Sequence, residues 1–235
     1  GVFALAVPLS AKLGLSAAGA LAGYIVVTAL MLCVFSLLVL YPMAAVGGRI
    51  SLADFARGSF SAQAVAFSAR SSLAALPAMM ESSRSRLRLP QQVTSFFLPL
   101  AASTFRVGGA LGLTIGVVFI ARLYGVTLAP AQLATIVLTV VLTTFSVPGI
   151  PAGSIIVMVP VLLAAGLPVE GMGILLGVDT IPDMFRTATN VTADMMAAVV
   201  IGRGERDEHA PVAAPDVAPA LAPDVPPDVA PVVAP

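Results

Sequence analysis

Charge and the side chains most used in catalysis and metal binding are scarce in this sequence of 235 residues. Only 10% of the residues are charged, against about 25% in an average soluble protein, while 58% are hydrophobic and the mean hydropathy is +1.01. The single cysteine, Cys33, lies in an apolar run, and the single histidine, His209, lies in a charged segment near the C-terminus. The sequence therefore excludes an ordinary soluble domain, a disulfide framework, a thiolate metal cluster and histidine-based catalysis.

Two long uncharged runs indicate membrane-spanning helices. Residues 13–48 and 123–169 hold no charged side chain over 36 and 47 residues, and a helix needs about 20 apolar residues to cross a bilayer. We therefore expect an all-α polytopic membrane protein, multi-pass in the cell inner or plasma membrane, with the lipid bilayer as a partner. Nucleic acid is not an expected partner, because the arginines form no basic strip interleaved with aromatic side chains. No cofactor is expected.

Breaks in the apolar pattern divide the chain into helices of different length. Residues 1–50 are expected to hold the end of one membrane helix, up to residue 11, and one full transmembrane helix over 15–47. Residues 51–202 are expected to form a core made of a hairpin over 55–89, a broken helix over 90–124, a second hairpin over 130–166 and a polar helix over 171–201. Hairpin arms of about 15 residues cross only half of a ~30 Å hydrocarbon layer, which predicts two re-entrant helical hairpins. A hairpin followed by a helix occurs twice in this order, which predicts an inverted repeat of the kind found in secondary transporters.

The charges at the helix ends predict an orientation. Five arginines surround the base of the first predicted hairpin, namely Arg49, Arg57, Arg84, Arg86 and Arg88, whereas Lys12, Arg122 and Glu170 lie at opposite helix ends. The positive-inside rule places that base, and with it the C-terminus, in the cytoplasm. Residues 203–235 carry a formal charge of −4 against +4 for the preceding 202 residues. Their composition of Pro, Ala, Asp and Val predicts a disordered cytoplasmic tail.

The predicted polar helix carries its polar side chains on one face. Taken at 100° per residue, six side chains fall within an arc of about 100°, namely Asp179, Asp183, Arg186, Thr187, Asn190 and Asp194. Each ionised side chain that faced lipid would cost about 2.5 to 3.5 kcal/mol, so this face must meet protein, water or a ligand. One interpretation is a structural ion-pair network, in which Arg70, Arg106 and Arg186 balance the three aspartates.

The other interpretation is a binding site for a small anionic amino acid. The planar fork of Arg186 suits a carboxylate, and Asp183 suits an ammonium group. Asp194 and Asn190, further along the same face, suit a cation.

The tips of the two predicted hairpins complete this second interpretation. Exposed backbone at membrane depth is tolerated only where it lines a cavity. We therefore expect both tips to offer backbone amides to a second carboxylate, and the first tip to add the hydroxyls of Ser71 and Ser72.

Five stretches of the chain carry a resemblance to a known family. They are GVFALAVP at Gly1, RSSLAALP at Arg70, PLAASTF at Pro99, GIPAGS at Gly149 and DTIPDMFRTATNVTAD from Asp179 to Asp194. Through them the chain resembles the dicarboxylate/amino acid:cation symporter family, the glutamate transporters, over residues 1 to about 202. The resemblance implies a homotrimeric symporter of acidic amino acids such as glutamate and aspartate, or of related dicarboxylates, with an elevator-type mechanism. It also implies that the chain is the C-terminal portion of such a transporter, whose first helices would precede Gly1.

The resemblance also assigns roles to individual positions. Asp183 would hold the substrate amino group, which favours an acidic amino acid, and Arg186 would hold the side-chain carboxylate. Thr187 and Asn190 would add further substrate contacts, and Asn190 with Asp194 would form a sodium site. The tip residues of the candidate site are Ser71, Ser72, Ile150, Pro151, Gly153 and Ser154.

The predicted broken helix departs from the family pattern. Where the family has N-M-D-G-T, this chain has Phe105, Arg106, Val107, Gly108 and Gly109. The Asn and Asp of a buried sodium site and a substrate-binding Thr are thereby replaced. We hypothesise that the Arg106 guanidinium takes the electrostatic role of a bound sodium ion, giving a carrier that is proton-coupled, less strongly coupled or changed in substrate. Na+ and H+ both stay open as the coupling ion, and a salt bridge from Arg106 to Asp194 or Asp179 in a degenerate paralogue is the alternative.

Two other functional classes are alternatives to a transporter, and the sequence favours them unequally. The first is a non-transporting paralogue that acts as a membrane scaffold or interaction protein through its Pro-rich tail. The second, an intramembrane aspartyl protease, is not expected, because Asp179 and Asp183 lie one turn apart on one helix. A catalytic dyad needs two acids that share a site, facing each other from separate helices, so the chain is not expected to be an enzyme.

Overall fold

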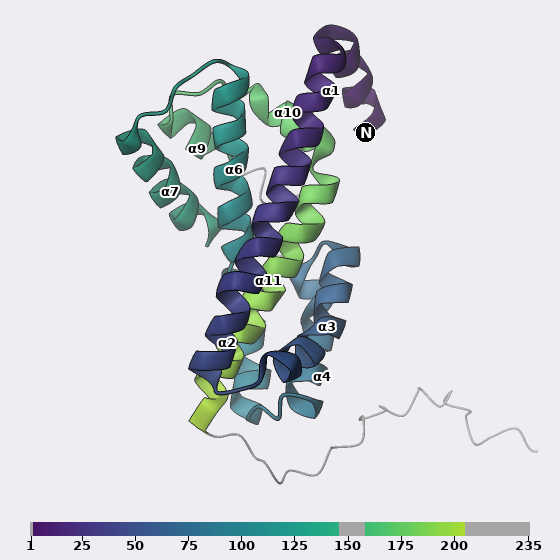
Figure 1. Cartoon of the computed structure of the whole chain (residues 1–235), viewed down its shortest axis with the longest axis vertical. Coiled ribbons are helices and arrows are strands. Elements are labelled where there is room, and N and C mark those ends of the chain that lie inside the picture. Colours follow the sequence, from purple (N-terminus) through teal and green to yellow (C-terminus); the bar gives the residue numbers. More distant parts are fainter. Residues whose placement is uncertain (1, 146–157, 205–235) are drawn as a thin grey trace, which may run out of the picture.

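The computed structural model describes residues 2–145 and 158–204, with side chains from residue 18 onward. Within these ranges every regular element is a helix, and the longest helices lie side by side along the long axis of the molecule (Figure 1). The expected tip of the second hairpin, with Ile150, Pro151, Gly153 and Ser154, lies outside the described residues, as does the tail from residue 205.

The N-terminal part of the chain is one continuous helical rod. α1 (Val2–Phe35) passes through a π-helical segment (Ser36–Leu40) into α2 (Tyr41–Gly48). The rod ends at Arg49, whose φ of 52° lies in the left-handed region. Where the sequence predicts a helix end at residue 11, the structure continues as a helix, because lysine keeps a high helix propensity and a single glycine costs only about 1 kcal/mol.

α3 (Leu52–Ala69) and α4 (Ser72–Ser85) lie antiparallel in the segment expected to form the first hairpin. The Ser51 hydroxyl caps α3 by accepting a hydrogen bond from the Asp54 amide at 3.0 Å, as expected of a serine N-cap. Arg70 turns the chain with a φ of 53°, and the Ser71 hydroxyl caps α4 by accepting from the Ala74 amide at 3.2 Å. The N-terminus of α4 therefore begins immediately after the turn.

The next helix is interrupted, and the remaining described helices are shorter. A π-helical segment (Val93–Phe97) leads into α5 (Leu98–Thr104), and α6 (Val107–Leu123) follows after two non-helical residues. Phe105 is extended, with a φ of −82° and a ψ of 119°. The other described helices are α7 (Pro130–Thr144), α9 (Met158–Ala164), α10 (Gly171–Val178) and α11 (Thr180–Ile201).

Asp179 separates α10 from α11, within the polar helix expected over 171–201. Pro182 has no N–H to donate to the carbonyl of Val178, and its ring conflicts with that carbonyl, so helical hydrogen bonding stops there. α11 begins with the Asp183 amide donating to the Asp179 carbonyl at 2.8 Å. The Asp179 side chain therefore projects from the N-terminus of α11.

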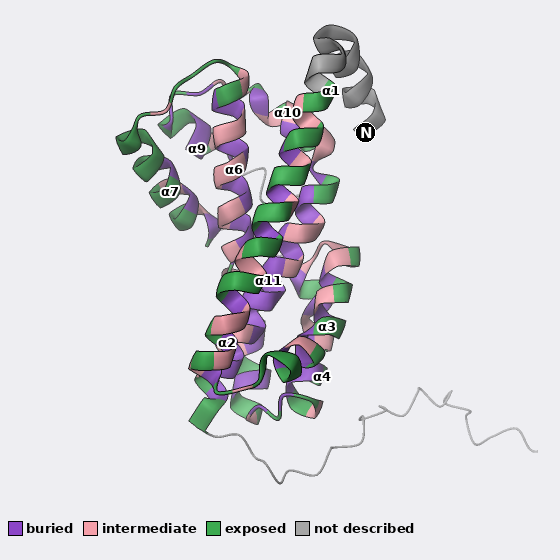
Figure 2. Cartoon of the chain, viewed as in Figure 1, coloured by how far each residue is buried: buried purple, intermediate pink, exposed green. Residues whose placement is uncertain are grey.

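Two apolar clusters occupy opposite ends of the described core. One joins α3, α4 and α5 to the C-terminal half of α11, through Phe55, Met79, Leu98, Val191, Met195 and Val199. The other joins α6, α7, α9 and α10, through Leu113, Ile120, Ile136, Met158, Leu162 and Leu175. The stretch of α11 between the clusters carries the polar side chains and is buried, whereas the outer face of α1 is exposed (Figure 2).

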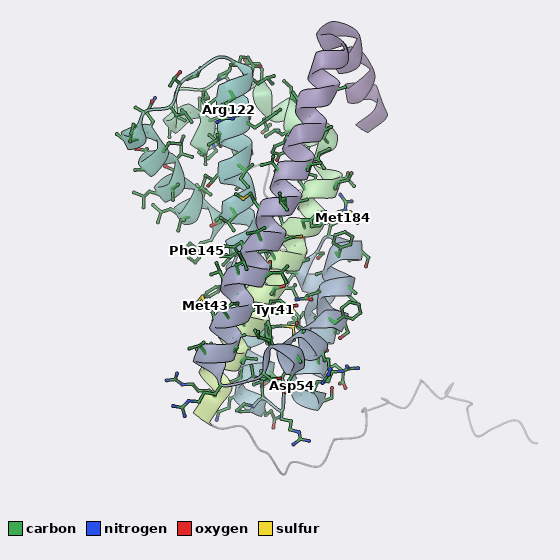
Figure 3. The ribbon with its side chains drawn as sticks, viewed as in Figure 1. Tyr41, Met43, Asp54, Arg122, Phe145 and Met184 are labelled. Carbon is green, nitrogen blue, oxygen red and sulfur yellow. The ribbon has the colours of Figure 1, made fainter. Side chains whose placement is uncertain are left out.

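Apolar side chains also cover the outside of the molecule. On the N-terminal rod Leu38 is 71% exposed and Val46 is 81% exposed, and on α7 Leu142 is 62% exposed. Two helical segments, Ala18–Gly48 and Val93–Leu123, are long and apolar enough to cross a membrane. Polar groups instead mark the two ends, where Asp54 lies near the start of α3 and Arg122 near the end of α6 (Figure 3).

α6 packs so closely on α11 at Gly108 that there is no room for an added methyl group, which makes the packing testable by mutation. A Cβ on Gly108 would lie 2.3 Å from the Arg186 carbonyl oxygen and 2.9 Å from the Thr189 Cβ. Gly108→Ala is therefore expected to force the helices apart and to lower the melting temperature of the detergent-solubilised protein by several degrees.

Gly173→Ala, in α10, is the matched control for this measurement. No described atom lies within 4 Å of the added Cβ, and alanine is more favourable than glycine inside a helix by about 0.5 to 1 kcal/mol. This variant is expected to melt at the wild-type temperature or above it. A Gly108→Ala protein as stable as the Gly173→Ala protein would contradict the close packing of α6 on α11.

Candidate functional site

Three interruptions of the helices lie along the molecule: the turn between α3 and α4, the break between α5 and α6, and the junction between α10 and α11. The first two lie close together, whereas the third lies nearer the end of the molecule that holds α10 (Figure 1). Arg106 Nη1, at the second interruption, donates to Ser72 Oγ, at the first, over 3.5 Å. The Gly108 amide donates to Asn190 Oδ1 on α11 at 2.8 Å. The fold thus brings together residues that are far apart in the sequence.

Arg186 is a buried charge near the start of α11. Its side chain is 1% exposed, and its Nη2 donates to Asp179 Oδ1 at 2.5 Å and to Asp183 Oδ1 at 3.2 Å. Arg186 Nε and Nη1 and Asp179 Oδ2 have no hydrogen-bond partner among the described residues. The group therefore keeps donors and an acceptor that a small charged ligand could use.

Gly112 of α6 makes room for this arginine. A Cβ at position 112 would lie 2.3 Å from the Cδ and 2.8 Å from the Cγ of Arg186. Any larger residue would push the stem of Arg186 away from its path across α6. The missing side chain at position 112 therefore allows the guanidinium to reach Asp179 at the α10–α11 junction.

Three polar side chains of the N-terminal rod also face this region and were not predicted from the sequence. Tyr24 and Thr28 are buried, at 3% and 0% exposure, and the charges of Arg186 and Asp179 act on the Tyr24 hydroxyl. Ser36, on the same rod, lies 3.2 Å from Thr189 of α11, hydroxyl to hydroxyl. The signal for these residues was a spacing of four and eight positions along an otherwise apolar run, which places them on one helix face.

Arg106 and Asp194 belong to a second charged group, and Asp194 lies eight residues beyond Arg186 on α11. Arg106 is 8% exposed, and its Nη2 donates to the Ala102 carbonyl at 3.3 Å. Asp194 is completely buried, and neither of its oxygens has a hydrogen-bond partner among the described residues. Asp194 and Asp183 are the two acids whose charge acts on Arg106. The guanidinium therefore lies in the field of both carboxylates.

The other candidate residues have local roles in the structure. The Thr187 hydroxyl donates to the Asp183 carbonyl at 2.8 Å within α11. The Ser71 hydroxyl caps α4, whereas Ser72 is buried beside Arg106. Arg70 is partly exposed at the turn, and its charge acts on Asp179. Among the described residues no group of three or more His, Cys, Asp or Glu side chains is arranged to hold a metal ion.

The comparison with known proteins decides the family. A family model described as the sodium:dicarboxylate symporter family matches residues 1–203. The chain belongs to this family. The match confirms the resemblance carried by the five sequence stretches, and it makes the chain a member of a family of membrane transporters rather than of enzymes.

The individual relatives that the chain matches are named as symporters or amino acid transporters. The chain is 34% identical over 205 residues to the proton/glutamate-aspartate symporter of Escherichia coli (strain K12), which is 87% of this chain and 46% of that protein. It is 32% identical over 205 residues to the proton/sodium-glutamate symport protein of Bacillus subtilis (strain 168), covering 87% and 47%. It is 32% identical over 197 residues to excitatory amino acid transporter 3 of Mus musculus, covering 84% and 36%. The chain spans less than half of the length of each of these relatives.

The burial of the Arg186 group predicts a large effect on stability. Arg186→Met would leave two buried carboxylates without their cation, which is expected to cost about 3 to 5 kcal/mol. The free energy of unfolding, or the melting temperature in detergent, measures this loss.

Arg57→Met is the matched control, because it also removes an arginine that is paired with an aspartate. Arg57 lies 3.6 Å from Asp54, and the two side chains are 75% and 59% exposed. An exposed ion pair contributes at most about 1 kcal/mol, so this variant is expected to retain nearly all of its stability. Similar losses in the two variants would contradict a buried ion pair at Arg186.

Proposed function

We propose that this chain forms the substrate-binding part of a secondary active symporter. Its substrates would be acidic amino acids such as glutamate and aspartate, or related dicarboxylates, carried across the inner or plasma membrane together with Na+ or H+. The observation that supports this proposal is a buried cation and a buried anion side by side, Arg186 and Asp183, in the first two turns of α11.

The pairing of Arg186 suits an exchange of carboxylates. Without substrate, its guanidinium is held by Asp179 and Asp183. A substrate side-chain carboxylate would take over the guanidinium, and the substrate ammonium would take Asp183. Opposite charges stay paired throughout the exchange, whereas removing one partner alone from a buried pair costs several kcal/mol. The two-point contact would use Nη2, once the aspartates release it, together with the unpartnered Nε or Nη1 of Arg186.

The start of α4 suits the second carboxylate of the substrate. α4 has 14 residues, and Ser71 and Ser72 stand at its N-terminus, where helix amides and the helix dipole favour an anion. The resemblance adds Ile150, Pro151, Gly153 and Ser154 from the tip of the second hairpin. Thr187 and Asn190 would border the substrate from α11. Together these groups would surround a small anionic amino acid on several sides.

The helix lengths and directions support an elevator-type transporter with two re-entrant hairpins. α3, α4 and α7 have 18, 14 and 15 residues, fewer than the about 20 that a membrane-crossing helix needs. α3–α4 and α7–α9 lie toward opposite ends of the molecule (Figure 1), as expected for inverted repeats around a central site. The full-length protein would be a homotrimer of such carriers.

The arginine distribution supports a cytoplasmic C-terminus. Arg86 Nη1 donates to the Arg57 carbonyl at 3.4 Å, and Arg203 Nη1 donates to the Gly47 carbonyl at 3.3 Å. The base of the α3–α4 pair and the end of α11 both lie at the lower end of the molecule (Figure 1). The positive-inside rule would place this arginine-rich end in the cytoplasm.

The decisive experiment is uptake of radiolabelled substrates by the full-length protein in proteoliposomes. Wild type is expected to accumulate L-glutamate or L-aspartate, and Arg186→Ala is expected to lose uptake of every dicarboxylate. Asp183→Asn is expected to lose glutamate uptake at least 100-fold while retaining uptake of succinate, because succinate has no ammonium group to pair with residue 183.

Arg57→Met is the control for protein quality in this assay, since it lies at the exposed base of α3. Its uptake is expected to match that of wild type. An absence of Arg186-dependent flux for every substrate, in protein that is folded and reconstituted, would contradict the proposed function.

A further inference from the structure

The carboxylate of Asp194 in α11 is buried and makes no hydrogen bond to a described residue, so its charge must be compensated or removed in another way. Asp194 is 0% exposed, and both of its side-chain oxygens lack a hydrogen-bond partner among the described residues. An ionised carboxylate at this depth is costly unless a cation lies close to it. A bound cation, a basic side chain or a proton on the carboxyl must therefore compensate or remove this charge.

Asn190, the other expected ligand of a cation near Asp194, has its oxygen engaged elsewhere. Asn190 Oδ1 accepts from the Gly108 amide at 2.8 Å and from the Gly109 amide at 3.2 Å. An amide oxygen has two lone pairs, and the amide nitrogen is only a donor, so this side chain has no free acceptor for a metal ion. The two amides belong to the first turn of α6 and need such an acceptor because the helix is broken before them.

Arg106 occupies the place where a cation would be favoured. Its guanidinium donates to the Ala102 carbonyl at 3.3 Å, in the last turn of α5, and carbonyls at a helix C-terminus attract positive charge. Its Nη1 lies 3.5 Å from Ser72 Oγ. Asp194 lies one helical turn beyond Asn190 on α11, and the Asn190 oxygen accepts from the Gly108 and Gly109 amides, just after Arg106 in the chain. A carbonyl, a hydroxyl and a carboxylate are the oxygen groups that hard cations take as ligands.

We propose that the Arg106 guanidinium is the permanent counter-charge of Asp194, so that substrate binds at this site without a sodium ion at Asp194. Arg106 acts here as a positioning residue, because it also ties the break between α5 and α6 to the start of α4. A second cation beside a fixed guanidinium would be repelled. The inference deepens the proposed function, but its direct readout is sodium binding, which does not require transport.

Equilibrium binding of 22Na+ to the purified full-length protein tests the inference directly. Wild type is expected to show no saturable sodium binding that depends on Asp194. Arg106→Met removes the charge but keeps a side chain of some length, and it is expected to gain one saturable site per protomer. The double variant Arg106→Met, Asp194→Asn is expected to lose that site again. A wild-type protein whose sodium binding is abolished by Asp194→Asn alone would overturn the proposal.

Binding of L-glutamate, with choline replacing sodium, gives the second readout. Wild-type affinity is expected to change less than twofold between sodium and choline, whereas Arg106→Met is expected to weaken at least tenfold in choline and to recover in sodium. Arg106→Lys keeps the charge and is expected to retain sodium-independent binding. Arg122→Met, at the opposite end of α6, controls for the loss of an arginine from that helix.

The outcomes separate this inference from the proposed function. If wild type binds no acidic substrate, the proposed function fails, while the 22Na+ measurement still decides the role of Arg106. If Arg106→Met is folded, as judged by a single symmetric peak in size-exclusion chromatography, and gains neither sodium binding nor sodium dependence, the inference is wrong. If Arg106→Met does not fold, Arg106→Gln takes its place under the same criteria, and Arg106→Lys must still behave as wild type.

Discussion

The structure depends on holding one guanidinium, that of Arg186, in a buried layer that would lie in the middle of a bilayer. A charge at that depth is tolerated only when it is paired, and the chain supplies two carboxylates within hydrogen-bond reach. Asp179 is in position because Pro182 makes α11 begin there, and the stem of Arg186 fits because Gly112 has no side chain. The two backbone features, a proline in a first turn and a glycine in a helix, thus serve the same ion pair.

The irregular backbone between α5 and α6 is stabilised for a related reason. A helix interruption frees amides and carbonyls that hydrocarbon cannot satisfy, and here nearby side chains satisfy them. Asn190 of α11 accepts from two amides at the start of α6, and Arg106 donates to a carbonyl at the end of α5. Arg106 also donates to Ser72, so the break is joined to the turn between α3 and α4 by a hydrogen bond. The two apolar clusters provide the packing that holds these helices against α11.

The polar face of α11 could be predicted from the sequence, because a helix fixes which residues share a face and an apolar helix makes charges conspicuous. The contribution of Tyr24 and Thr28 was harder to predict, since neither carries a charge in an apolar run. The partner of Asn190 could not be predicted, because its oxygen binds amides that only the approach of α6 to α11 brings near. The sequence could not decide whether the helix is interrupted at Asp179, because a proline is compatible both with the first turn of a new helix and with a kink in a continuous one.

Charge balance connects the candidate site to cation coupling in the proposed transporter. The site and its surroundings hold three arginines and three aspartates, namely Arg70, Arg106, Arg186, Asp179, Asp183 and Asp194, so their summed formal charge is zero. Glutamate and aspartate bring a net charge of −1, and moving an uncompensated charge through the membrane interior is costly. A neutral loaded carrier therefore needs one positive charge to travel with the substrate. Because Arg106 already balances Asp194 in the proposed arrangement, that charge would be a proton or a cation bound elsewhere.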